Sequence, residues 1–233
     1  MFPQVKLESV TSVSAAIDNM KKIDASLPAN DGLACFNRMY LDVTRDVEGK
    51  LKAQYFADPE FITKLDVTFA NGYFNMVNHA DQPSTVERAW RPLIKRRGKP
   101  GIEEIQFALA GMNAHINYDL PMAIVDTFAA LHTSPTANKA YRADYQKVDG
   151  LLDKAAQTVR RSFETKSERA ADLRLRLIAN LANDWSINGA RDIAWSNARL
   201  LWEVRAVGLA RKLFLNGLAC TVEVAGRTLL IAV

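Results

Sequence analysis

The stretch that decides the fold is IEEIQFALAGMNAHINYDLPMAIVDTFAAL, residues 102–131. Its length and its nearly continuous apolar character predict one long helix in the hydrophobic core. The helix nevertheless carries four polar side chains within seven positions, namely Asn113, His115, Asn117 and Asp119. Pro121 follows, and because proline has no backbone N–H, it predicts a kink that leaves a carbonyl without its helical donor. We therefore expect the functional site at this point of the chain.

Helical periodicity and helix-start signals extend over most of the remaining sequence. Asp31 precedes a run with helical apolar spacing and is a favoured N-cap, and Asp58-Pro59 combines a cap with a proline suited to the first turn. Ser84 begins a capping box that ends at Glu87 and predicts a short basic helix. We expect helices over residues 9–25, 31–51, 58–74, 84–97, 102–131, 138–163, 167–182 and 184–215.

The C-terminal residues have a different pattern. Asn216-Gly217 is typical of a helix end, and the β-branched stretches CTVEV and TLLIAV then flank Ala-Gly-Arg. This pattern predicts a short β-hairpin within residues 217–233. Because the sequence contains no repeat and no long linker, we expect residues 1–233 to form a single all-α domain, a multi-helix bundle with or without that hairpin.

The composition is that of an ordinary globular protein. The chain has 233 residues, of which 48% are hydrophobic and 24% are charged, and its net charge is +4. This charge is too small to indicate nucleic acid as a partner, and the basic run from Arg88 to Lys99 is typical of a solvated helix face. Cys35 and Cys220 form no disulfide motif, and neither a signal peptide nor a membrane-spanning stretch is evident. We therefore expect a cytoplasmic protein.

His115 and Asp119 are four positions apart, so that in a helix they lie on one face, one turn apart. This spacing permits two kinds of chemistry. The two side chains can bind one divalent metal ion such as zinc, or the carboxylate can hydrogen-bond to the imidazole, fix its tautomer and increase its basicity. Asp66 lies in an apolar run, where a charge requires a partner, and is the expected third member of either site. His79 is a candidate further metal ligand.

Other polar and aromatic side chains are expected to contact a small-molecule substrate near this pair. They are Asn113, Asn117, Tyr73, Asn71, Tyr40, Arg191 and Trp195. The same residues also fit a structural role, because asparagine and aspartate near a proline often only cap or end a helix. The sequence contains no G-x-S-x-G motif, no P-loop and no dinucleotide fingerprint, which disfavours the corresponding hydrolases, NTPases and dehydrogenases.

The stretches DGLACFNRMYLDVT, LDVTFANGY, ALAGMNAHINYDLP and ARDIAW together resemble a family of uncharacterised bacterial proteins filed as a domain of unknown function. The resemblance covers most of the chain, roughly from Ile17 to Trp202. It implies an all-helical fold and brings no established activity.

A second similarity concerns the chemistry alone. The segment His115 to Met122 is similar to the HxxxD segment, followed by proline, of zinc-dependent phospholipases C and the related S1/P1-type nucleases. That resemblance implies that His115 and Asp119 are zinc ligands. Those enzymes use several more histidines and an N-terminal tryptophan, whereas this chain has three histidines and begins with Met1. The resemblance therefore implies a site for one or two metal ions at most.

Two hypotheses of different classes follow. In the first, the protein is an enzyme with a pocket between helices. In one mechanism His115 is a metal ligand of a hydrolase. In the other no metal is present, and His115 is a general acid–base that catalyses isomerisation, elimination or cyclisation of a small apolar molecule. In the second, the protein is a non-catalytic helical binding or interaction protein whose polar cluster fixes the helix register. An enzyme requires His115 to face a cavity of a few hundred Å³, whereas a structural network requires every buried polar atom to be paired.

Overall fold

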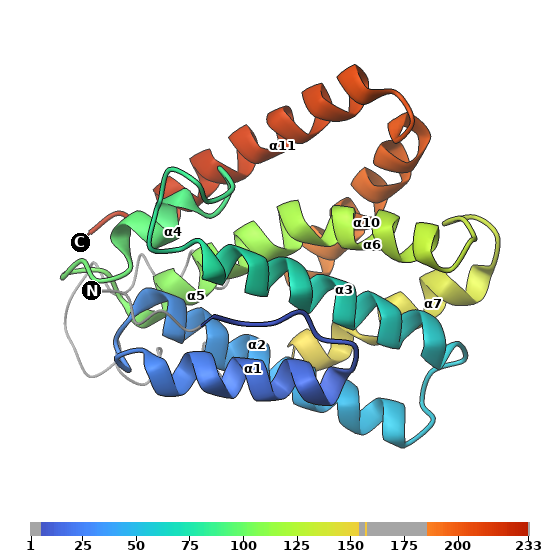
Figure 1. Ribbon diagram of the computed structural model, residues 1–233, viewed down its shortest axis with the longest axis horizontal. Helices are drawn as coiled ribbons and strands as arrows, with labels where there is room; N and C mark the ends of the chain where they lie inside the picture. The colour runs from blue at the N-terminus through green and yellow to red at the C-terminus, as the bar shows by residue number, and fades with distance from the viewer. Residues whose placement is uncertain (1–5, 154–156, 158–185, 233) are drawn as a thin grey trace.

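The structure is a computed structural model, which describes residues 6–153, 157 and 186–232 (Figure 1). Within these residues every regular element is a helix, as the sequence predicts. None of the described helices is both long and apolar enough to cross a membrane. Three parts of the expected helices lie outside the described residues, namely the helix over 167–182, the end of the one over 138–163 and the first two residues of the one over 184–215.

The first three helices are α1 (Val13–Ser26), α2 (Gly32–Lys52) and α3 (Pro59–Asn78). Asp31 Oδ1 accepts a hydrogen bond from the backbone N–H of Leu33 at 2.9 Å, and Asp58 accepts one from Phe61 at the same distance. Both predicted caps are therefore confirmed. The helix expected from Ser9 begins only at Val13, because Ser12 is extended and caps it through its side chain.

The basic segment forms a much shorter helix than the sequence predicts. Only α4 (Arg91–Arg96) is α-helical there, and residues 84–90 are mainly turns. The Arg91 guanidinium donates to the carbonyls of Val86 and Ser84, which stabilises the turn instead of a helix. The side chain of Trp90, which ends this turn segment, is fully buried. The helix start predicted at Ser84 is thus wrong, because long-range burial of Trp90 decides the local conformation.

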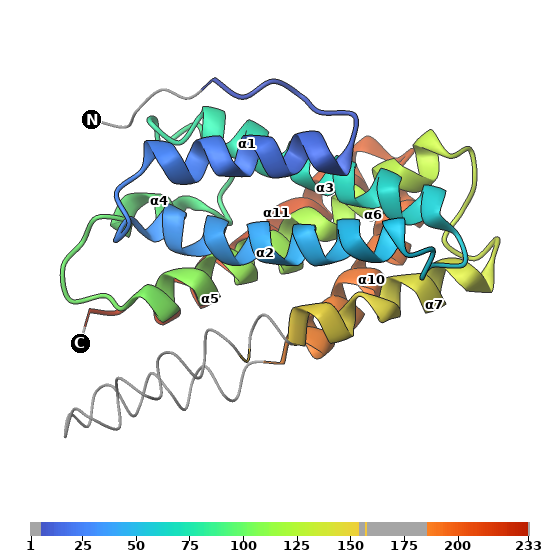
Figure 2. The same cartoon turned by 90° about the horizontal axis from the view of Figure 1, so that it is seen from below.

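The predicted long helix is present and forms the centre of the molecule. It consists of α5 (Glu104–Ala114), a π-helical turn η1 (His115–Asp119) and α6 (Leu120–Ala130). Figure 2 shows α2 lying between α1 and α5, and α6 packs against α3 and α10. The irregularity predicted at Pro121 takes the form of the π turn just before it, in which the N–H of Leu120 donates to the carbonyl of His115.

The C-terminal part contains α7 (Lys139–Lys147), α10 (Ile187–Val204) and α11 (Gly208–Leu229). In Figure 1, α11 runs from its corner with α10 back towards α4, and it packs on α4 and α5. The continuous helix expected over 184–215 is therefore divided between α10 and α11.

The β-hairpin predicted within residues 217–233 is wrong, because α11 continues through Gly217 to Leu229. Contacts with the rest of the molecule favour the helix over the strand preference of its β-branched residues. Asn113 Nδ2 donates to the carbonyl of Val222 at 2.9 Å, and the buried Glu223 forms ion pairs with Arg88 and Arg227.

Candidate functional site: a buried histidine beside an apolar cavity

The π turn positions His115 and Asp119 against each other. The Nδ1 atom of His115 lies 3.0 Å from Oδ2 of Asp119, and the side chain of His115 is only 3% exposed. Trp90 Nε1–H donates to the same Oδ2 atom at 2.9 Å. The geometry therefore corresponds to the hydrogen-bonded form of the pair. Because Asp119 Oδ2 already accepts from Trp90, a proton on Nδ1 of His115 gives a favourable second bond and leaves Nε2 unprotonated.

Five aromatic rings surround the imidazole. Phe69 stacks on it in parallel, with ring centroids 3.5 Å apart, and Tyr40 contacts it edge-on at 4.5 Å. Phe36, Tyr73 and Trp90 follow at 5.6 to 5.9 Å. Removal from water lowers the pKa of His115, and this effect outweighs the hydrogen bond and the charge of Asp119, which raise it. His115 is therefore neutral at neutral pH.

The imidazole lines a cavity of about 70 Å³ between α2, α3, η1 and α10, which we call the His115 cavity. Most of its wall is apolar, with Val43, Leu65 and Met112 among the lining residues. Four polar residues also line it, namely Tyr40, Asp66, His115 and Arg191. The structure thus brings together His115 and Asp66, as well as two of the expected substrate contacts, Tyr40 and Arg191.

Three polar atoms at this cavity are buried without a hydrogen-bond partner among the described residues. They are Nε2 of His115, Oδ2 of Asp66 and the phenolic oxygen of Tyr40. Arg191 differs from them, because its guanidinium donates to Asp149 and to the carbonyl of Tyr145. Buried polar atoms are nearly always paired, so three exceptions around one cavity mark it as unusual.

Burial shifts the proton equilibria of the two acidic groups. It raises the pKa of Asp66 from 3.8 to about 7, so the carboxyl group is partly protonated at neutral pH. The pKa of Tyr40 lies well above its usual range, through burial and through the nearby charge of Asp66. Tyr40 is thus a phenol at neutral pH and can donate a hydrogen bond.

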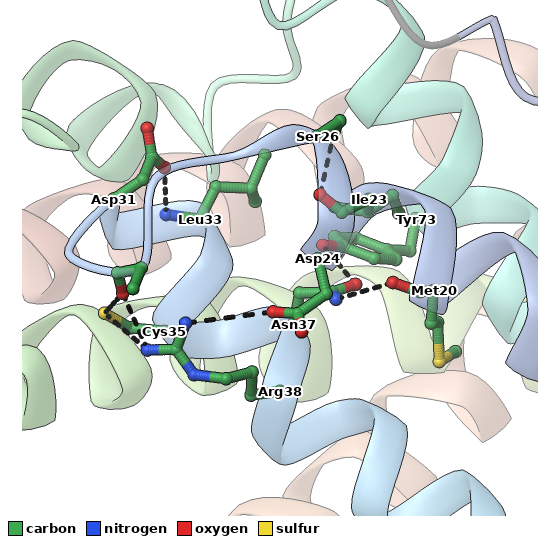
Figure 3. Close-up of polar contacts among 11 residues, drawn as sticks. Met20, Ile23, Asp24, Ser26, Asp31, Leu33, Cys35, Asn37, Arg38 and Tyr73 are labelled. Carbon is green, nitrogen blue, oxygen red and sulfur yellow. Dashed lines mark hydrogen bonds and ion pairs between the residues drawn. The ribbon is translucent and has the colours of Figure 1, made fainter. Parts of the chain in front are cut away.

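Several expected substrate contacts lie away from the cavity and join parts of the chain to one another. Asn71 binds both backbone groups of Val10, at 2.8 and 2.9 Å. The hydroxyl of Tyr73 donates to Asn37, whose amide donates to the carbonyl of Met20 (Figure 3). These contacts hold the N-terminal segment and α1 against the helices that carry the site.

The remaining three expected substrate contacts also lie outside the cavity wall. Asn117 Nδ2 donates to Asn113 Oδ1 at 3.1 Å, and Asn113 in turn donates to α11. These two residues connect the π turn to the C-terminal helix. Trp195 packs against Tyr145, with ring centroids 4.9 Å apart. All three residues support the elements that carry the site.

The residues expected as metal ligands are not gathered around one point. His79 ends α3, where its Nδ1 lies 2.7 Å from the carbonyl oxygen of Asn75. In the part of the chain that the structure describes, no three His, Cys, Asp or Glu side chains come together in a way that could hold a metal ion. Since Nδ1 of His115 faces Asp119 directly, the carboxylate orients the imidazole.

The sequence interpretation missed two residues of this centre, Trp90 and Phe69. Trp90 lies beside a basic run, which resembles a solvated surface, and Phe69 has the spacing of an ordinary core residue. A buried tryptophan requires a partner for its N–H, but the sequence does not reveal that Asp119 is that partner.

These features define an all-α protein whose central helix carries a buried His–Asp pair beside a small apolar cavity. The chain belongs to the family of unknown function DUF5995, which matches residues 13–232. This match confirms the resemblance to a helical family without an assigned activity. No curated protein and no solved structure matches the chain.

Proposed function

We propose that this protein is a cofactor-free acid–base catalyst that acts on a small, mostly apolar molecule in the His115 cavity. The proposal rests on one observation. Nε2 of His115, Oδ2 of Asp66 and the hydroxyl of Tyr40 line this cavity and are buried without partners among the described residues. Each such atom costs the fold about 1–3 kcal/mol. A ligand oxygen that hydrogen-bonds to them would offset part of that cost.

His115 is the proposed base. It is neutral at neutral pH, because burial lowers its pKa. With its proton on Nδ1, directed at Asp119, the lone pair of Nε2 is available to a ligand. The Asp119 carboxylate would stabilise the imidazolium that forms when Nε2 takes up a proton.

Asp66 is the proposed acid, and Tyr40 assists it. Because the pKa of Asp66 is about 7, both protonation states are populated near neutral pH, and the carboxyl group can either donate or accept a proton. The reaction best suited to this set is proton abstraction next to a carbonyl. His115 takes the proton from carbon, the C–H electron pair becomes the new C=C bond, and the carbonyl oxygen takes a proton from Asp66. If the enol is conjugated, His115 returns its proton to another carbon, the O–H proton goes back to Asp66 and the C=O bond re-forms, which completes an isomerisation.

The size of the cavity limits the substrate. Its volume of about 70 Å³ is below the few hundred Å³ expected for an enzyme pocket, so the cavity holds only a ligand of a few heavy atoms unless its walls move. The apolar lining favours a compact hydrocarbon body with one or two oxygen atoms. Arg191 lines the same cavity, but its guanidinium is already bound by Asp149 and Tyr145, so we assign it a supporting role.

The second candidate is a binding protein that holds a small apolar molecule without converting it. It is favoured by the almost complete apolar wall of the cavity. A metal-dependent hydrolase has less support, because Asp119 hydrogen-bonds to His115 and no third donor joins them among the described residues.

The first experiment tests the proposed base directly. NMR spectra of protein labelled with ¹⁵N in histidine report the protonation of each ring nitrogen. We expect His115 to be neutral at pH 7 and to carry its proton on Nδ1. A proton on Nε2 would contradict the assignment of His115 as the base.

The second experiment separates catalysis from binding. Small ketones such as acetone are incubated with the protein in D₂O, and the exchange of their α-protons is followed by ¹H NMR. We expect the wild type to accelerate the exchange, and His115→Gln and Asp66→Asn to abolish the acceleration. His132→Asn is the matched control, because His132 is exposed and lies outside the His115 cavity, and it should match the wild type. Binding of the ketone without exchange would favour the second candidate.

A further inference from the structure

The two members of the His–Asp pair border different spaces. His115 lines the His115 cavity, whereas Asp119 lines a separate cleft of about 400 Å³ between α3 and α6, which we call the Asp119 cleft. The side chain of Asp119 is 10% exposed and that of His115 only 3%. Phe69 lies on the walls of both spaces and stacks on the imidazole, so it helps to separate them.

A buried base needs a route by which its protonation state is reset. While a substrate fills the His115 cavity, Nε2 has no access to water on that side. On the other side, Nδ1 faces Asp119 Oδ2 at 3.0 Å, and Asp119 borders the larger cleft. Glu87, Asp126 and His79 also line this cleft and are further proton acceptors on its wall.

We propose that the His115–Asp119 pair relays protons between the His115 cavity and the Asp119 cleft. This inference rests on the proposed role of His115 as a base. When Nε2 accepts a proton, the proton on Nδ1 passes to the Asp119 carboxylate, and the resulting carboxylic acid releases it to solvent in the cleft. The imidazole is then neutral, with its proton on Nε2. The reverse sequence returns a proton to the substrate and restores the proton on Nδ1.

Trp90 is a positioning residue in this relay. Its Nε1–H donates to the same oxygen of Asp119 that faces His115, and the fully buried residue is part of the wall of the cleft. It therefore holds the carboxylate in line with the imidazole.

Two glycines allow a matched test of the route. Gly72 lines the Asp119 cleft, and a Cβ atom added there meets no other atom within 4 Å. Gly49 on α2 is equally open and lines neither space. Gly72→Phe and Gly72→Leu should therefore fill the cleft, and Gly49→Phe is the control for the effect of the substitution itself.

The measurement is the exchange rate of the His115 Nδ1 proton with water, obtained by NMR on the full chain labelled with ¹⁵N in histidine. We expect both Gly72 variants to slow this exchange about tenfold or more, because local opening of the protein must then replace direct access. Gly49→Phe should leave the rate unchanged. Asp119→Asn should slow it even with the cleft open, since an amide does not take up the proton.

Two results would overturn the relay. One is an equal exchange rate in Gly72→Phe, Gly72→Leu and wild type. The other is a rate that falls only when Val47→Phe fills the His115 cavity. The experiment uses no substrate, so a failure to detect catalysis leaves its outcome unchanged, and the relay can fail while His115 remains a base.

Discussion

Asp144 and Asp66 lie in two regions of the molecule whose surroundings shift the pKa of a carboxyl group in opposite directions. Asp144, on α7, accepts hydrogen bonds from the backbone N–H groups of Ala57 and Asp58, at 3.0 and 2.6 Å, and from Lys147 at 2.7 Å. Burial alone would raise its pKa, but these donors outweigh that effect and hold the pKa below its usual range. Oδ2 of Asp66 receives no comparable donor from the part of the chain that the structure describes, and burial raises the pKa of this side chain to about 7.

This difference in hydrogen-bond donors shows how each aspartate affects the stability of the fold. Asp144 connects α7 to the start of α3, and every bond that it accepts strengthens the fold. Within the described residues no group donates to Oδ2 of Asp66, so the ionised form of this side chain weakens the fold. A carboxyl group that faces a cavity at such a cost is better explained by a ligand than by stability, which supports its proposed role as an acid.

The largest effect is expected where the satisfied aspartate is changed. Asp144→Asn replaces an acceptor-only group by an amide whose NH₂ faces backbone donors. We expect a loss of about 3–5 kcal/mol in the free energy of unfolding at pH 7, because the charge-assisted hydrogen bonds from Ala57, Asp58 and Lys147 are lost or weakened. Urea unfolding measures this loss. Asp42→Asn is the control, because Asp42 is an exposed aspartate in a surface ion pair and should change stability little. An equally small effect at Asp144 would remove the contrast between the two regions.

A change of stability with the opposite sign is expected at Asp66, whose Oδ2 atom has no hydrogen-bond partner among the described residues. Near pH 8 the Asp66 carboxyl is ionised and poorly solvated, and Asp66→Asn removes that charge. We expect the variant to be more stable than wild type by about 2–4 kcal/mol at pH 8, since one pKa unit corresponds to about 1.4 kcal/mol. At pH 4 both side chains are neutral, so the difference should vanish. Urea unfolding at the two pH values tests this, and a destabilised Asp66→Asn at pH 8 would show that the carboxylate has a favourable partner.

The third prediction uses the opposite titration of the two groups at the cavity. The folded-state pKa of Asp66 is raised, so between about pH 4 and 7 only the folded state binds this proton, and stability falls as pH rises. The folded-state pKa of His115 is lowered, so below about pH 6.5 only the unfolded state binds that proton, and stability rises as pH rises.

The two contributions therefore oppose each other in the wild type between about pH 4 and 6.5. We expect the stability of Asp66→Asn to rise over this range relative to wild type, and that of His115→Gln to fall, each by at most about 1.4 kcal/mol per pH unit. Urea unfolding at several pH values measures the slopes. Parallel curves for the three proteins would contradict the assigned pKa directions.

Much of the fold could be predicted from local signals. The caps at Asp31 and Asp58 and the long apolar helix over residues 102–131 depend on nearby residues, and the structure confirms them. The C-terminal hairpin was predicted from β-branched composition, but Gly226 lets α11 lie close to Pro92, where an added Cβ would be 3.3 Å from its ring. Such contacts between distant segments outweigh local propensity, and a single sequence does not reveal them.

In the candidate site, too, local spacing predicted some features, whereas others depend on the packing of distant segments. The spacing of His115 and Asp119 predicted their contact, and the apolar neighbours of Asp66 identified it as unusual. That Asp66 and His115 share one cavity depends on how α3 packs against η1, which spacing along the chain does not specify. For the same reason the amide of Asn71 was expected near a substrate, whereas the structure places it on the backbone of Val10.

The smallest change in stability is expected at Trp90. A substitution there removes one hydrogen-bond donor from a carboxylate of the site itself, Asp119. Trp90→Phe keeps an aromatic ring beside His115 and removes one donor from Asp119. We expect a loss of about 1 kcal/mol in the free energy of unfolding, because water in the Asp119 cleft can replace part of the lost hydrogen bond.

The same variant should change the titration of His115. A carboxylate with fewer hydrogen bonds stabilises the imidazolium more strongly, so the pKa of His115 should rise. NMR titration of the His115 ring measures that shift, and Trp202→Phe, which lies outside both spaces, should leave it unchanged. If Trp90 served packing alone, its variant would lose stability while the titration of His115 stayed the same, so the titration separates a role in positioning Asp119 from a purely structural one.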